Sequence, residues 1–223
     1  MLNPDIREPL STGEPVVAGT NDALSAAYGA LASSNAQARL AARGRRQTYR
    51  KGAILINEGE ISDGVYIILS GSVNVYSMDE EARDIIFATL GAGDYFGEMS
   101  LDGGPRSASV ITLERTECAV LSKAQVVQYM TENPHFAQEL LLTVIRRARE
   151  ATRIARALAL QDVTSRLRDF LEREATVSPD GSRALPGRMT QQDIAARIGC
   201  GREMVSRAMA ELKRRGVTVC RAG

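Results

Sequence analysis

Short apolar runs rich in β-branched residues recur between positions 52 and 121, and turn signals separate them. The turn signals include Glu58-Gly59, Asp63-Gly64 and Ser70-Gly71, which are typical of the boundaries between strands. Many short strands at this spacing favour a β-sandwich or a β-barrel. The predicted strands cover residues 54–56, 65–69, 73–76, 85–90, 108–112 and 117–121.

The pattern becomes helical at Asn133-Pro134, where the proline suits a first helical turn because its missing N–H costs little there. Seven small or apolar residues then follow a 4-3-4-3-4-3 spacing, which is typical of a heptad seam. They are Ala137, Leu141, Val144, Ala148, Ala151, Ala155 and Leu158. A helix packed on its own domain could carry the same stripe, but the arginine-rich remainder of this helix favours pairing with a second copy.

Residues 190–214 predict two short helices joined by a tight turn. Thr190 and Asp193 have the spacing of a capping box, and Gly199 suits a left-handed helix end. Ala195, Gly199 and Val205 supply the small, flexible and branched residues that two crossing helices require. The pattern therefore predicts a helix-turn-helix, with Ile194, Ala195 and Ile198 inward on the first helix and Val205, Met209 and Leu212 inward on the second.

The outward residues of the second helix are Arg202, Glu203, Ser206 and Arg207. Arginine can bind guanine through two hydrogen bonds, and glutamate can accept from N4 of cytosine. Such residues often form a solvated, ion-paired surface, but within this motif they favour contacts with DNA bases in the major groove.

Charge is distributed unevenly along the chain, although the formal net charge is only +1. Residues 51–138 carry 5 basic and 13 acidic groups, a net charge of −8, whereas residues 161–223 carry 12 basic and 8 acidic groups, a net charge of +4. The basic C-terminal third suits a phosphate backbone as partner.

Length and composition limit the classes of protein to which this chain can belong. The 223 residues, 44% hydrophobic and 25% charged, suit one large or two small globular domains. No apolar run approaches the roughly 18 residues of a membrane span, and the N-terminus lacks the pattern of a secretory signal. Cys118, Cys200 and Cys220 are scattered and indicate reduced thiols. We therefore expect a cytoplasmic protein with no membrane partner.

The segment from Phe96 to Val110 joins two predicted strands and concentrates several unusual features. Its glycines allow backbone N–H groups to turn inward. Glu98 can accept from a ribose hydroxyl, Arg106 suits a single phosphate group, and the Ser107 hydroxyl lies beside the arginine.

These motifs together resemble the cyclic-AMP receptor protein (CRP/FNR) family of bacterial transcription factors, over roughly residues 38–220. The most specific parts are the segment 96–110, here called the cassette, and the run 199–207. The resemblance implies an α+β fold with a cyclic-nucleotide-binding β jelly roll, a long dimerisation helix and a winged helix-turn-helix whose wing is shortened. It divides the chain into an N-terminal arm and helix (1–37), a nucleotide-binding domain (38–132), a dimerisation helix (133–160) and a DNA-binding domain (161–223).

The resemblance also implies roles for individual residues. Gly97 and Glu98 would lie at the sugar, and Arg106 with Ser107 would hold the cyclic phosphate. The implied nucleotide-binding set is Gly97, Glu98, Met99, Ser100, Arg106, Ser107, Ala108 and Thr152. The implied DNA-binding set is Thr190, Gln191, Arg202, Glu203, Ser206 and Arg207.

The implied effector is cyclic AMP or cyclic GMP, without a metal. The implied partners are a palindromic DNA with TGTGA-like half-sites, a second copy of the chain and RNA polymerase. A hinge at Gln161-Asp162-Val163-Thr164 would connect the effector to the DNA-binding domain. This chain departs from the family pattern at Ala151-Thr152, where the family's nucleotide receptor has a Thr-Ser pair, and Ala151 cannot bond the base. The choice between the two nucleotides is therefore open.

Several alternatives remain at this stage. The cassette could be vestigial or bind a different effector. An iron–sulfur sensor is disfavoured because residues 1–117 contain no cysteine. His135 favours a structural role over haem ligation, and Cys118 favours a buried inert thiol over a redox sensor. An enzyme is disfavoured because no histidine base or metal-ligand cluster accompanies Glu98.

Overall fold

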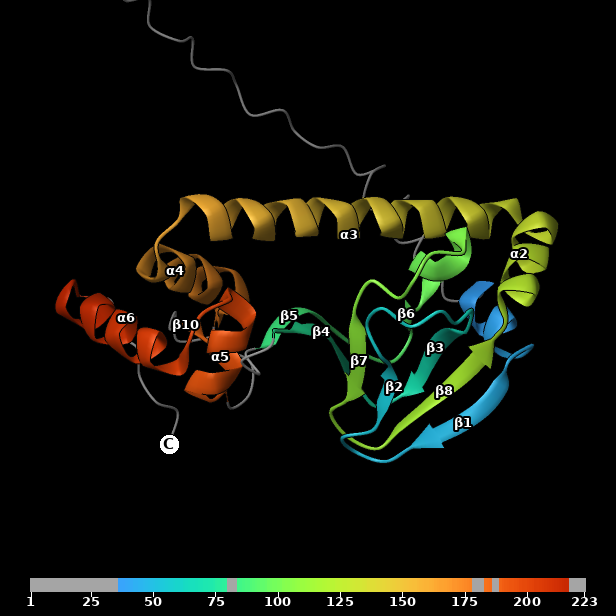
Figure 1. The fold of residues 1–223 in the computed structure, drawn as a ribbon, viewed down its shortest axis with the longest axis horizontal. Coiled ribbons are helices and arrows are strands. Elements are labelled where there is room, and N and C mark those ends of the chain that lie inside the picture. The colour runs from blue at the N-terminus through green and yellow to red at the C-terminus, as the bar shows by residue number, and fades with distance from the viewer. Residues whose placement is uncertain (1–35, 80–83, 178–182, 186–188, 217–223) are drawn as a thin grey trace, which may run out of the picture.

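The N-terminal part of the structure is a sandwich of two antiparallel four-stranded sheets (Figure 1). The computed structural model describes residues 36–79, 84–177, 183–185 and 189–216. One sheet has the order β1-β8-β3-β6 and the other has the order β2-β7-β4-β5. The strands are β1 (Arg45–Tyr49), β2 (Ile54–Ile56), β3 (Val65–Ser70), β4 (Val73–Met78), β5 (Asp84–Leu90), β6 (Tyr95–Phe96), β7 (Ser109–Thr112) and β8 (Thr116–Leu121).

The sheet that contains β3 and β8 is covered on both faces, which explains its nearly continuous apolar runs. Successive side chains of a strand point to opposite faces. Val65 and Ile67 of β3 therefore pack in the cluster under the helices, while Ile68 packs between the two sheets. In β8, Ala119 joins the first cluster and Cys118 joins the second.

The Cys118 thiol is fully enclosed between the sheets, with 0% of the residue exposed. Burial raises the pKa of this thiol to about 11, so almost no thiolate exists at pH 8. We expect Cys118 to resist iodoacetamide in the folded protein and to react in urea, as measured by peptide mass spectrometry. The half-buried Cys200 serves as the internal comparison. Equal labelling rates of Cys118 with and without urea would contradict this burial.

Two helices follow the sandwich, α2 (Lys123–Glu132) and the 27-residue α3 (Pro134–Leu160). Pro134 occupies the first turn of α3, as predicted. Phe136 and Leu140 are the buried residues of α3. The following turns of α3 expose several large apolar side chains, namely Leu141, Leu142, Ile145, Leu158 and Leu160.

The C-terminal unit is built from short helices around its own core. Its elements are α4 (Val163–Glu174), β9 (Thr176–Val177), β10 (Arg183–Ala184), α5 (Gln191–Ile198) and α6 (Arg202–Arg214). The buried residues of this core are Leu167, Phe170, Ile194, Ala195, Ile198, Val205, Ala208 and Leu212.

The C-terminal unit contacts the sandwich through α5, which packs beside β5 (Figure 1). Arg197 of α5 donates to the hydroxyl of Thr89 on β5 over 2.8 Å. Gly199 lies so close to Leu158 at the end of α3 that an added Cβ would come within 2.7 Å of its Cδ2 atom. One short contact region thus joins β5, α3 and the turn after α5.

The structure confirms the predicted mixture of a β-rich N-terminal part, a long helix and a C-terminal helix-turn-helix. Each of the six predicted strands is present, with ends displaced by at most two residues. The sequence did not predict β1 or β6. The predicted N-terminal arm and helix, up to residue 35, and the wing after Gly216 lie outside the described residues. Within the described ranges, no helix has the length and apolar character needed to cross a membrane.

Candidate functional sites

The cassette begins with a glycine turn directly after β6. Gly97 has a left-handed backbone with φ of 87°, and it precedes the 3₁₀ helix η1 (Glu98–Asp102). An added Cβ on Gly97 would lie 2.6 Å from the carbonyl oxygen of Gly64 and 2.8 Å from Nη1 of Arg106. Only glycine therefore allows the chain to turn here while Arg106 lies against it.

Arg106 is 4% exposed and is held by backbone and hydroxyl oxygens. Its Nη1 donates to the carbonyl of Gly97 and to Oγ of Ser100, both over 2.9 Å. Its Nε donates to Oγ of Ser62 over 2.8 Å, and its Nη2 donates to the carbonyl of Gly64 over 2.7 Å. These bonds use four of the five N–H groups of the guanidinium. Burial lowers the pKa of Arg106, and nearby acidic groups oppose that effect.

Glu98 places a carboxylate at the junction of the cassette and α3. The Glu98 side chain is 2% exposed, and its Oε1 lies 2.7 Å from Nη1 of Arg147. The angles of this ion pair fall short of a hydrogen bond, so neither Glu98 oxygen has a hydrogen-bond donor among the described residues. Arg147 also donates to the backbone carbonyl of Tyr95 over 2.6 Å and lies over its ring. The carboxylate is thus compensated in charge but free to accept hydrogen bonds.

The remaining residues predicted to bind the nucleotide differ in how exposed they are. Met99 and Ser107 are exposed, Ser100 is buried against Arg106, and Ala108 is half-buried. Thr152 is exposed on α3, where its hydroxyl donates to the carbonyl of Ala148 in its own helix.

Sequence reasoning missed Ser62, Gly64 and Arg147 as parts of this site. Ser62 and Gly64 come from the loop between β2 and β3, more than 40 residues from Arg106. Arg147 is one of five arginines between residues 146 and 156, and nothing in that run distinguishes it.

The helix-turn-helix forms from local signals. The backbone N–H of Thr190 donates to Oδ2 of Asp193 over 2.7 Å, and that of Asp193 donates to Oγ1 of Thr190 over 3.1 Å. Both bonds of the predicted capping box are therefore present. Gly199 ends α5 in the left-handed conformation, with φ of 65°. The turn then leads into α6, whose N-cap is Gly201.

The inward residues of both helices agree largely with prediction. Ile194, Ala195 and Ile198 of α5 are buried, as are Val205 and Leu212 of α6. Met209 is partly buried at the edge of this core, and Ala208, which was not predicted, is buried instead.

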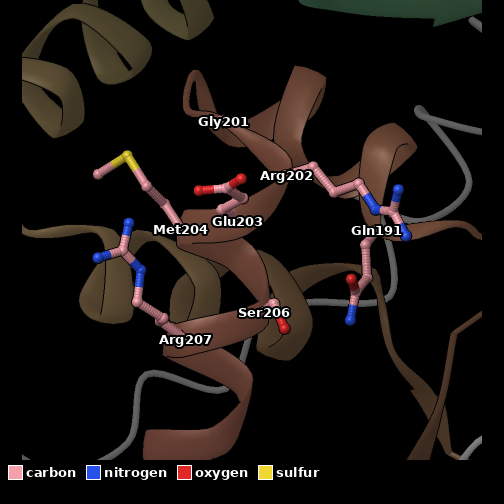
Figure 2. Close-up of a pocket in the computed structure, with 7 residues that line it drawn as sticks. All are labelled: Gln191, Gly201, Arg202, Glu203, Met204, Ser206 and Arg207. Carbon is pink, nitrogen blue, oxygen red and sulfur yellow. The ribbon is translucent and has the colours of Figure 1, made fainter.

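The outward face of α6 forms an open hollow together with the start of α5 (Figure 2). It is lined by Gln191, Gly201, Arg202, Glu203, Met204, Ser206 and Arg207. The four residues predicted to face outward are all exposed. Thr190 is exposed just beside this hollow, at the cap of α5. Sequence reasoning missed Met204, because an apolar residue on a helix is usually assigned to the core.

Arg166 of α4 connects the segment after α3 to the turn of the motif. It donates to the carbonyl of Gln161 over 2.9 Å and to that of Ile198 over 2.9 Å. A longer bond of 3.3 Å reaches the carbonyl of Gly199. The side chain of Arg166 therefore forms hydrogen bonds both at the end of α3 and at the end of α5.

Two family models match the chain. The cyclic nucleotide-binding domain matches residues 46–133, and the Crp-like helix-turn-helix domain matches residues 152–223. The cAMP-activated global transcriptional regulator CRP of Haemophilus influenzae is 34% identical over 172 residues, which are 74% of this chain and 75% of that protein. The chain belongs to the CRP/FNR family of transcription regulators.

Other CRP/FNR proteins support the same assignment. CRP of Escherichia coli is 33% identical over 172 residues, covering 74% of this chain and 80% of that protein. The solved structure of the c-di-GMP responsive global regulator CLP from Xanthomonas campestris matches with a TM-score of 0.72 at 25% identity, over 84% of this chain and 95% of that one. Membership of the CRP/FNR family confirms that the chain is a DNA-binding transcription regulator with a cyclic-nucleotide-binding domain, and not an enzyme.

Proposed function

We propose that this chain is a cyclic-nucleotide-responsive, sequence-specific DNA-binding regulator that acts as a homodimer. The observation that carries the effector assignment is the buried Glu98 carboxylate, which accepts no hydrogen bond from the part of the chain that the structure describes and lies in the same cassette as Arg106. A buried polar group without a hydrogen-bond partner is costly. A ribose hydroxyl would supply the missing donor.

The cassette residues fit a cyclic nucleotide in charge and in hydrogen bonding. Bound there, the nucleotide supplies a hydroxyl donor and a phosphate acceptor, and no covalent step is involved. Glu98 would accept from the 2′-hydroxyl. Arg106 would offer its fifth N–H and its charge to the phosphate, and the exposed Ser107 would donate its hydroxyl. Gly97, Met99, Ser100 and Ala108 would complete the pocket wall, and Thr152 would meet the base.

Coupling to DNA would pass through α3. Arg147 holds Glu98 from α3, so a ligand that bonds the Glu98 carboxylate would alter the grip of Arg147 on the cassette. Displacement of α3 would reach Gln161 at its end and, through Arg166, the turn at Gly199. The proposed allosteric states are the arrangement of these contacts without a ligand and their arrangement when a ligand bonds Glu98.

Homodimerisation is supported by the apolar surface of α3. Leu141, Leu142 and Ile145 are large, apolar and exposed on a single long helix. Small residues of the predicted seam, Ala148, Ala151 and Ala155, are exposed as well and would allow a second helix to approach closely. We propose the division 38–132, 133–160 and 161–223 for sensing, pairing and DNA binding, with RNA polymerase as a further partner of the DNA-bound dimer.

DNA recognition is assigned to the outward face of α6. Arg202, Glu203 and Arg207 would contact base edges of a TGTGA-like half-site, with Ser206, Gln191 and Thr190 at its margins. Two such faces in a homodimer would require a palindromic site.

The second candidate function is that of a regulator that responds to an effector other than cyclic AMP or cyclic GMP. Arg106 already uses four N–H groups within the protein, which leaves one for a phosphate. A structural neighbour is named for its response to c-di-GMP rather than to cyclic AMP.

Titration of the full chain with cyclic AMP and with cyclic GMP, by calorimetry, tests the proposal. We expect micromolar binding of at least one nucleotide, and nucleotide-dependent binding to a TGTGA palindrome over a scrambled duplex. Glu203→Ala should reduce the preference for the palindrome and leave nucleotide binding unchanged. If neither nucleotide gives a binding heat and neither raises the thermal stability of the chain, the result would support a different effector.

A further inference from the structure

Met204 stands out on the DNA-facing surface because it is apolar and 41% exposed. It lies in the first turns of α6, between Glu203 and the buried Val205. Figure 2 shows its side chain on the same flank of α6 as Arg207, whereas Arg202 projects from the opposite flank, toward Gln191 of α5. Met204 therefore lies within the hollow that the charged residues line.

The position of Met204 is not explained by the core of the unit. Val205, Ala208 and Leu212 fill the inward face of α6 and are almost fully buried. The other large side chains that line the hollow are polar or charged. Met204 does not belong to the apolar core cluster of this unit, and its flexible thioether side chain can adapt to an irregular apolar surface.

The major groove of DNA presents one apolar group, the C5-methyl of thymine. The first turns of a recognition helix are the part that approaches base edges. We propose that Met204 is a specificity-determining residue that contacts a thymine C5-methyl in each half-site, next to the base pair contacted by Arg207. This inference rests on the proposed function of α6, and it adds an apolar contact to the hydrogen bonds assigned to the charged residues.

The contact can be tested by replacing single thymines with deoxyuridine, which removes the methyl group and retains base pairing. Binding would be measured with the full chain at saturating cyclic AMP and, in a parallel series, at saturating cyclic GMP, on duplexes substituted one position at a time. Loss of one buried methyl group corresponds to about a fourfold weaker affinity. We expect this penalty at one thymine of each half-site.

Met204→Ala should abolish the penalty at that position and leave the other positions unchanged. Alanine is well tolerated at an exposed helix position, so the variant should fold. Met78→Ala is the matched control, because Met78 is an exposed methionine on β4, outside the DNA-binding unit. The control should keep the full deoxyuridine penalty.

Two results would overturn the inference while leaving the proposed function intact. The first is wild-type binding that is equal for thymine and deoxyuridine at every position, although Arg207→Ala still weakens it. The second is a penalty that persists unchanged in Met204→Ala. Failure of the wild-type chain to prefer the palindrome with either nucleotide would instead refute the proposed function, and the inference with it.

Discussion

Replacing Arg147 with alanine is expected to lower the free energy of unfolding by about 3 kcal/mol, because it leaves a buried carboxylate without its compensating charge. Glu98 is 2% exposed and lies 2.7 Å from the Arg147 guanidinium. The substitution also removes the bond from Arg147 to the carbonyl of Tyr95. Urea denaturation measured by circular dichroism gives the change directly.

Arg149→Ala is the matched control for this prediction. Arg149 is an exposed arginine two residues further along α3, and a surface substitution of this kind changes stability by roughly 0.5 kcal/mol or less. Glu98→Gln combined with Arg147→Ala should recover part of the loss, since no buried charge remains unpaired. Equal effects of Arg147→Ala and Arg149→Ala would show that the ion pair contributes nothing measurable.

Arg106→Ala is expected to weaken nucleotide binding by about 100-fold, which corresponds to the loss of one charge-assisted hydrogen bond to a phosphate. Calorimetric titration measures the change. Because Arg106 also bonds Gly97, Ser100, Ser62 and Gly64, thermal unfolding must show that the variant is folded at the temperature of the titration.

Two further variants separate binding from folding. Ser107→Ala changes an exposed hydroxyl and should weaken nucleotide binding several-fold without loss of stability. Arg115→Ala removes an exposed arginine of the turn between β7 and β8 and should affect neither property. If Arg106→Ala folds and binds nucleotide as tightly as the wild type, Arg106 does not contact the phosphate.

The fold was predictable from sequence where the signals are local. The strands within the sandwich combine apolar runs with turn glycines, and those were found. Strand β1 was missed because Arg45, Arg46 and Gln47 are polar residues of an edge strand. Strand β6 was missed because it has only two residues, Tyr95 and Phe96.

The helix-turn-helix was predictable from local signals, whereas the contacts of the cassette were not. The capping box of Thr190 and Asp193 joins residues three positions apart, so its spacing alone predicts the start of α5. The partners of the cassette come from distant segments. Arg147 lies 49 positions after Glu98 in the chain, and a contact of that range depends on how α3 packs across the sandwich.

The contact between α5 and β5 also has a consequence for how regulation scales with protein concentration. Among the described residues it includes the bond from Arg197 to Thr89 and the close approach of Gly199 to Ile85. Only Gln161 and Asp162 separate α3 from α4, and such a short connection gives an effective concentration on the order of millimolar. Docking of the DNA-binding unit on its own sensor is thus insensitive to dilution, whereas pairing through α3 would depend on the number of molecules in the cell.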